Sequence, residues 1–289
     1  MKSSNVKLLF FTVSMLSALV LTNCSSGGGS SSSNQKQLQP GPQNLTATAG
    51  VQKVFLTWDP VANASLYNVY YSNSPLVTTT TGTLASSVTG TGYTHANLNF
   101  GAHHYLVTAM VTSVETAASN TASAGVNLVS FVTSSVGTGD LSTWPDAVSA
   151  GTATGLAAGD AVCQARAQAA GLTGTFKGWL SDDNNDAYCR MHGLSGRKSA
   201  NCGQTALPAW AGPWVRMDGE PFAEVISKLT GSYAVLTPAK LDEMNHLAPY
   251  EYWTGTNIYG ESSTDTCTGW TDSSSVGYGR EGSREGISN

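Results

Sequence analysis

The residues most able to do chemistry in this chain are its five cysteines, and their spacing separates them. Cys189 and Cys202 flank a short polar loop, CRMHGLSGRKSANC, and a disulfide that closed it would remove about 3 kcal/mol of unfolded-state entropy. We therefore expect these two residues to be bridged. The competing interpretation is a metal site of Cys189, His192 and Cys202, but this set lacks a clear fourth ligand. Whether Cys163 and Cys267 pair stays open.

Other patterns that could support catalysis or ion binding are weak. The chain has no HExxH, G-x-S-x-G or P-loop motif, and His192 and His246 are isolated. The run DDNND, Asp182 to Asp186, places oxygens at alternate positions as a calcium loop does. However, Ala187 and Gly193 stand where such a loop needs a glycine and a bidentate acid. We expect an acidic turn here, and neither an enzyme nor a bound metal or cofactor.

The composition indicates an exported, β-rich chain of two domains. It has 289 residues, and only 11% are charged, well under the usual quarter. Gly, Ser and Thr fill the gap. The net charge is −5, and the part from Ser130 onward holds 17 acidic and 10 basic residues. Because a phosphate-binding surface needs clustered lysines and arginines, we do not expect a nucleic acid partner.

The N-terminus has the pattern of an export signal. Lys2 and Lys7 precede an apolar run, Leu8 to Leu21, which is too short to cross a bilayer. The run ends in LTNC, which resembles the lipobox of bacterial lipoproteins. The resemblance implies a signal peptide over 1–23, lipid on Cys24, and a flexible Gly/Ser tether over 24–42 with a reach on the order of 20 Å. The alternative is a plain secretion signal with a chance cysteine.

Residues 43–127 are predicted to form an antiparallel β sandwich. Short apolar and β-branched runs alternate with turn residues, and period two places every second side chain of a run on one face. The residues predicted to face the core are Val54, Leu56, Trp58, Tyr67, Val69, Tyr71, Tyr105, Val107 and Ala109.

The order of these runs, from PGPQNLTA through VFLTWDP, YNVYYS and YTHANLNFG to YLVTAMV, resembles a fibronectin type III domain. The resemblance implies that Trp58 is buried and that Leu98–Gly101 forms the turn before a long strand. In fibronectin type III domains a tyrosine hydroxyl usually forms a hydrogen bond that closes this corner, and in this chain His103 or His104 stands at the position of that tyrosine. Either an imidazole N–H replaces its hydrogen bond or the corner is looser. As strand neighbours, the two histidines should point to opposite faces, which disfavours a metal site between them.

Residues 128–289 are predicted to form an α+β domain. LVSFVTSS, GTFKGWLSD and YEYWTGT have the pattern of strands. The alanine-rich stretch from Ala157 to Ala170, with Asp160 in its first turn and Gly171 directly after it, predicts a helix. TPAKLDEMNHL predicts a second helix, with Thr237 as its cap.

CQARAQAAGLTGTFKGWLSD, VRMDGEPF and YWTGTNIYGESSTDTCTGWTDSS, in this order, resemble the endostatin-like domain of unknown function found in surface lipoproteins of Leptospira. Its fold is related to C-type lectins. In this family the partners of the cysteines matching Cys163 and Cys267 lie in final strands that this chain does not reach. The two residues would then pair with each other or stay free. The lectin calcium motifs are each altered at one place, in Glu220–Phe222 and Trp270–Asp272, so calcium-dependent sugar binding is not expected.

Family members with known behaviour act as adhesins that bind laminin, fibronectin and complement regulators such as factor H. The resemblance implies a lipid-anchored protein of the bacterial outer membrane, at the cell surface, that binds these partners or plasminogen. The alternatives are a structural envelope lipoprotein without a host ligand and a carbohydrate-binding, lectin-like module. Because aromatic and arginine side chains dominate interface hot spots, the candidate contact residues are Arg190, Arg197, Arg216, Trp210 and Trp214.

Overall fold

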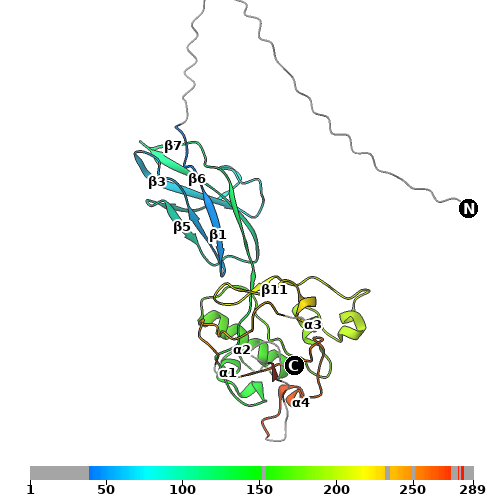
Figure 1. Cartoon of the computed structure of the whole chain (residues 1–289). Helices are drawn as coiled ribbons and strands as arrows, with labels where there is room; N and C mark the ends of the chain where they lie inside the picture. The colour runs from blue at the N-terminus through cyan, green and yellow to red at the C-terminus, as the bar shows by residue number, and fades with distance from the viewer. Residues whose placement is uncertain are drawn as a thin grey trace, which may run out of the picture. The chain divides into compact units, whose positions relative to one another are not determined.

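The computed structural model describes residues 39–151, 154–231, 235–248, 251–274, 279 and 281–282 (Figure 1). The predicted signal peptide, Cys24 and most of the predicted tether lie outside these residues. At the end of that predicted tether, Gly41 and Pro42 are buried, and a Cβ on Gly41 would lie 1.9 Å from the carbonyl oxygen of Ala117. Within the described ranges, no helix is both long and apolar enough to cross a bilayer.

The first part of the described chain is a sandwich of two antiparallel sheets. One sheet has the order β1-β2-β5, and the other has the order β4-β3-β6-β7, with β8 also paired to β6. The strands are β1 (Thr46–Gly50), β2 (Lys53–Thr57), β3 (Ala64–Ser72), β4 (Thr83–Val88), β5 (Gly92–His95), β6 (Gly101–Val111), β7 (Val114–Glu115) and β8 (Ala122–Val126).

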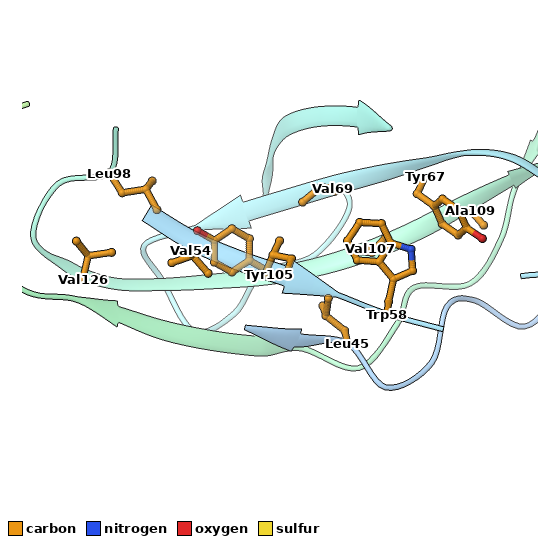
Figure 2. Close-up of a cluster of buried hydrophobic side chains, with 11 residues drawn as sticks. Leu45, Val54, Trp58, Tyr67, Val69, Leu98, Tyr105, Val107, Ala109 and Val126 are labelled. Atoms are coloured by element: carbon orange, nitrogen blue, oxygen red, sulfur yellow. The ribbon is translucent and has the colours of Figure 1, made fainter. Parts of the chain in front are cut away.

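The predicted core faces of the strands are confirmed in the sandwich, although Leu106 and Thr108, on the other face of β6, are buried as well. Eight of the nine predicted core residues are buried in one cluster between the sheets (Figure 2), and the ninth, Tyr71, is partly buried and packs against that cluster. Trp58 directly follows β2, and its ring lies 5.5 Å from that of Tyr67. Burial of these apolar surfaces stabilises the fold by roughly 25 cal/mol per Å² removed from water.

A histidine replaces the expected tyrosine at the corner before β6. Of the two candidates, His103 is buried and His104 is partly exposed, which is the predicted alternation. The Nε2 atom of His103 lies 2.9 Å from the carbonyl oxygen of Asn99 and donates to it. The corner is therefore closed by an imidazole N–H, the first of the two alternatives that the sequence left open.

The C-terminal region, residues 128–282, consists of short elements connected by long irregular segments. One sheet has the order β11-β10-β9, with β9 parallel to β10, and β12 pairs with β13. The elements are β9 (Leu128–Val129), η1 (Leu141–Thr143), α1 (Pro145–Ser149), α2 (Gly155–Ala169), α3 (Ala187–Met191), η2 (Lys198–Gly203), β10 (Trp214–Val215), β11 (Pro221–Ala223), η3 (Ile226–Lys228), β12 (Tyr252–Trp253), α4 (Cys267–Trp270) and β13 (Glu281–Gly282).

Helix α2 is the alanine-rich helix that the sequence predicts. It ends as predicted, because Gly171 has a φ of +71° and the amide of Leu172 donates to the carbonyl of Ala167 at 2.9 Å. Its start was misplaced, since the helix begins at Gly155. Asp160 therefore lies beyond the first turn and does not cap the helix.

Two other predicted elements were wrong. Residues 174–182, all of them described, form no strand, although burial alternates from Phe176 to Leu180. Side chains bind several backbone groups of this segment in place of a neighbouring strand. Residues 237–247 form no helix. There the carboxylate of Asp242 accepts from the amides of Met244 and His246, and Thr237 donates its hydroxyl to the carbonyl of Pro221. Such side-chain bonds compete with a helix.

Candidate functional site

Arg190, a predicted contact residue, instead binds the extended segment that follows α2. Its side chain is buried, with the residue 7% exposed, and Nη1 donates to the carbonyls of Gly178 and Leu180 at 2.8 and 2.9 Å. Nη2 forms an ion pair with Asp160 at 2.5 Å. Asp160 also accepts from the amide of Gly178. With its donors occupied inside the fold, Arg190 is removed from the candidate contact residues.

The predicted disulfide between Cys189 and Cys202 is confirmed, with a Cα–Cα distance of 5.3 Å. Neither sulfur is therefore available to the alternative metal site. Its third member, His192, directs Nδ1 to the carbonyl of Tyr188 at 2.9 Å. The bridge lies in a small buried cluster that Tyr188 and Ile226 complete. In the described part of the chain, no group of three His, Cys, Asp or Glu residues could hold a metal ion.

The predicted acidic turn positions the loop closed by this disulfide. Asp182 accepts from the amides of Asn184 and Asn185, as expected of a turn. Asp186 at its end is buried. Its carboxylate accepts from the amides of Lys198 and Ser262 at 2.7 and 2.8 Å. One carboxylate thus links the disulfide loop to the loop that precedes α4.

Tyr188 brings three loops together next to the disulfide. Its hydroxyl donates to the carbonyl of Pro208 at 2.6 Å, and its amide donates to the carbonyl of Gly260 at 3.1 Å. The ammonium group of Lys198 lies 4.7 Å from the centre of the Tyr188 ring and donates to the carbonyl of Tyr259 at 2.6 Å. Tyr188 and Lys198 therefore connect the segments that contain Pro208 and Tyr259 to the disulfide loop.

Two of these loops expose large apolar side chains. Trp210 is 84% exposed, and Ile258 and Tyr259 are also exposed, as is Leu207 to a smaller extent. We call these four residues the aromatic surface. Single exposed apolar residues are common, but several held on one supported base mark an interaction site. The arrangement suits binding to another protein.

Leu207, Ile258 and Tyr259 were not predicted from the sequence, although a local signal for the exposure of Ile258 and Tyr259 exists. Asn257 accepts from the amides of Tyr259 and Glu261 through its side chain, and the amide of Gly260 donates to its carbonyl. This is a tight turn, and Ile258 lies at its tip. Two large apolar residues between an asparagine and a glycine therefore predict exposure.

The remaining candidate contact residues differ in accessibility. Arg216 is buried, donates to the carbonyl of Pro238, and is paired with Asp218. The bond from Arg216 holds the pKa of the Asp218 carboxyl below its usual value. Trp214 is partly buried in β10, against the cluster around the disulfide. Arg197 is half-exposed and paired with Asp186 at 3.0 Å.

Cys163 and Cys267 are free thiols in this structure. Burial, with the nearby Asp160 carboxylate as a second cause, raises the pKa of the Cys163 thiol to about 12. Burial likewise raises the pKa of Cys267. Because the thiolate is the reactive form, neither residue is suited to nucleophilic chemistry.

No protein-family model and no curated protein matches the chain. Among solved structures, an Fn3-like protein from Clostridium thermocellum is 28% identical over 29% of this chain and 88% of its own, with a TM-score of 0.27. The structure called FN3tt is 18% identical over 30% of this chain and 97% of its own, with a TM-score of 0.25. A beta-1,2-glucanase from Parabacteroides distasonis is 23% identical over 30% of this chain and 12% of its own, with a TM-score of 0.27. On its own strand order, the sandwich has a fibronectin type III-like fold.

Proposed function

We propose that this chain is a lipid-anchored surface protein that binds a host protein through the aromatic surface of its C-terminal region. The observation that carries the proposal is Trp210, an exposed tryptophan on a loop that Tyr188 fixes beside a disulfide. Tryptophan and tyrosine contribute most to protein interfaces when they are pre-positioned on a supported base. Lipid on Cys24 would hold the protein in the bacterial outer membrane.

The partner class and the finer fold assignment are part of the same proposal. The resemblance to endostatin-like domains of the C-type-lectin class favours laminin, fibronectin, plasminogen or factor H as partners. Two structural features support that resemblance. Helix α2 is followed by Gly171 and an extended segment, and Trp270, within the last block of the resemblance, is fully buried. Its indole N–H donates to the carbonyl of Ser181, at the end of that segment, at 2.8 Å.

The binding test uses the full chain, purified with Cys24 replaced by serine, against the four immobilised proteins. The double variant Trp210→Ser/Tyr259→Ser should lose about a hundredfold in affinity, since hot-spot residues contribute about 1–2 kcal/mol or more each. The matched control is Leu236→Ser/Met244→Ser, which removes two exposed apolar side chains elsewhere in the C-terminal region. It should bind normally. No saturable binding by the parent chain, or equal binding by the two double variants, would contradict the proposal.

Membrane attachment and orientation need their own test. The native chain should label with palmitate and partition into detergent, and the Cys24→Ser variant should do neither. Protease added to intact cells should then cut the C-terminal region. A lipidated protein that the protease never cuts would favour the alternative, a structural envelope lipoprotein without a host ligand. Binding to a glycan array in calcium, lost in a chelator, would favour the lectin-like alternative.

A further inference from the structure

The sandwich contains a cluster of one histidine and three tyrosines that the proposed function does not use. His95, at the end of β5, lies with its ring 4.6 Å from that of Tyr71, edge to face. The rings of Tyr93 and Tyr105 lie 5.9 and 5.8 Å away. The Nδ1 atom of His95 lies 3.2 Å from the hydroxyl oxygen of Tyr105. Because β5 and β6 belong to different sheets, this hydrogen bond connects the two layers of the sandwich.

The direction of this bond depends on the protonation state of His95. Tyr105 is fully buried, and burial raises the pKa of its hydroxyl, so the hydroxyl keeps its proton and must donate it. Among the described residues, Nδ1 of His95 is the acceptor that the hydroxyl reaches. It can accept only while the imidazole is neutral, with its proton on Nε2. A proton on Nδ1 would leave the buried hydroxyl hydrogen without an acceptor.

Within the described part of the sandwich, the titratable groups that face His95 offer no negative charge to a protonated ring. They are Tyr71 from β3, Tyr93 from β5, and Tyr105 and His103 from β6. Strands β1, β4 and β8 carry no titratable side chain. Lys53 of β2 lies over the exposed ring of Phe55. The titratable group that disfavours a positive charge on His95 is therefore a second imidazole, that of His103.

We propose that His95 is an acid-sensitive switch that weakens the contact between the two sheets when it takes up a proton. Protonation of His95 breaks the hydrogen bond between Nδ1 and the hydroxyl of Tyr105, which connects the two sheets. It also places a positive charge among aromatic rings and near His103. Strand β5 lies at the edge of its sheet, so it can separate while β1 and β2 stay paired. The switch is independent of the aromatic surface and of membrane attachment.

The sign of the effect follows from the pKa of His95. Burial, with His103 as a smaller cause, lowers this pKa from its ordinary value of 6.5. The neutral form is therefore favoured in the fold, and its stabilising contribution is complete at pH values above about 6.5. It is lost as the pH falls below that value and through the lower pKa of the folded state. Each unit of lowering corresponds to about a tenfold change in the equilibrium for opening.

Amide hydrogen exchange in β5 and β6 of the whole protein, at pH 7.5 and pH 5.0, tests the switch. Protection factors should fall severalfold on acidification, after correction for intrinsic exchange. In His95→Asn the amide oxygen can still accept from Tyr105 but does not titrate, so the fall should disappear. His104→Asn, on the outer face of β6, should keep it. No fall in the parent protein, or an equal fall in His95→Asn, would overturn the proposal.

A second measurement covers the case in which His95→Asn does not fold. The imidazole ¹⁵N shifts of His95 in the parent protein should show an unprotonated Nδ1 at pH 7.5. Protonation of that atom and the loss of amide protection in β5 should then share one midpoint below pH 6.5. Separate midpoints, or a proton on Nδ1 at neutral pH, would contradict the mechanism.

Discussion

In the sandwich, an eleven-residue strand, β6, pairs with three other strands, whereas β11, the longest strand among the described residues of the C-terminal region, has three residues. The sandwich satisfies its buried backbone groups through ladders and covers them with one large apolar cluster. The C-terminal region uses side chains for the same purpose, and its buried apolar residues form two smaller clusters. In a strand ladder, many backbone hydrogen bonds hold each strand, so the loss of one contact leaves the others in place. Where one side chain binds two carbonyls, its removal breaks both hydrogen bonds at once. We therefore expect single substitutions to act differently in the two regions.

A large loss of stability is expected from Arg190→Met. The change keeps much of the side-chain volume but removes the guanidinium group that binds the carbonyls of Gly178 and Leu180 and pairs with the carboxylate of Asp160. Breaking such a buried pair costs about 3–5 kcal/mol. Chemical denaturation followed by tryptophan fluorescence would measure it. Lys177→Met, in the same segment but exposed, is the control. Equal midpoints for the two variants would refute the role given to Arg190.

A somewhat smaller loss is expected when the disulfide is removed. The double variant Cys189→Ser/Cys202→Ser frees a loop of sequence separation 13, and the free energy of unfolding should fall by about 3 kcal/mol. The parent protein in reductant should show the same fall by the same assay. Hydrogen exchange should show that the loss is confined to the C-terminal region. Loosening of β3 and β6 to the same degree would mean that the two regions do not respond separately.

His103→Phe tests the sandwich side of the comparison. The substitution removes the bond to Asn99, but the ladders of β6 remain, so the loss should be only about 1 kcal/mol. His103→Tyr places a hydroxyl at the corner and should cost less than the phenylalanine variant. Amide exchange in β6 gives the local measurement. A loss as large as that of Arg190→Met would remove the contrast between the regions.

The smallest effect on stability is expected at Trp210. Trp210→Ala removes an exposed side chain and should change the free energy of unfolding by no more than about 0.5 kcal/mol. Trp270→Ala, at a fully buried position, should cost about 3–5 kcal/mol. Thermal unfolding of the pair separates a tryptophan that serves binding from one that serves packing. A clear loss of stability in Trp210→Ala would place Trp210 in the second class.

The same contrast explains how far the sequence predicts the fold. Period two sufficed for the sandwich, because neighbouring strands supply the partners for each backbone group. From Phe176 to Leu180 the same alternation predicted burial correctly, but it did not predict the partner of the backbone carbonyls, which is the side chain of Arg190. The helix predicted over 237–247 failed because the Asp242 carboxylate binds the amides that a helix would use.

The parts of the candidate site that depend on residue chemistry, such as the disulfide, were predictable from the sequence. The parts that depend on which side chains are exposed were not. The disulfide followed from spacing and an exported context. Residue type alone, by contrast, predicted both Arg190 and Trp210 as contact residues without distinguishing between them. The first is buried by bonds to a segment ten or more residues away, and the second protrudes from a loop. No local pattern around Arg190 shows that its donors are occupied.

The parallel pairing of β9 with β10 has a consequence for the order of folding. The amide of Leu128 donates to the carbonyl of Pro213, so the first strand of the C-terminal region waits for a partner 85 residues later in the chain. In the sandwich, β3 can pair with β4 and β6 as soon as residue 111 has emerged. Long-range pairing slows folding because the loop must close first. During synthesis or export, the sandwich should therefore fold early, while the C-terminal region stays open until most of it is available.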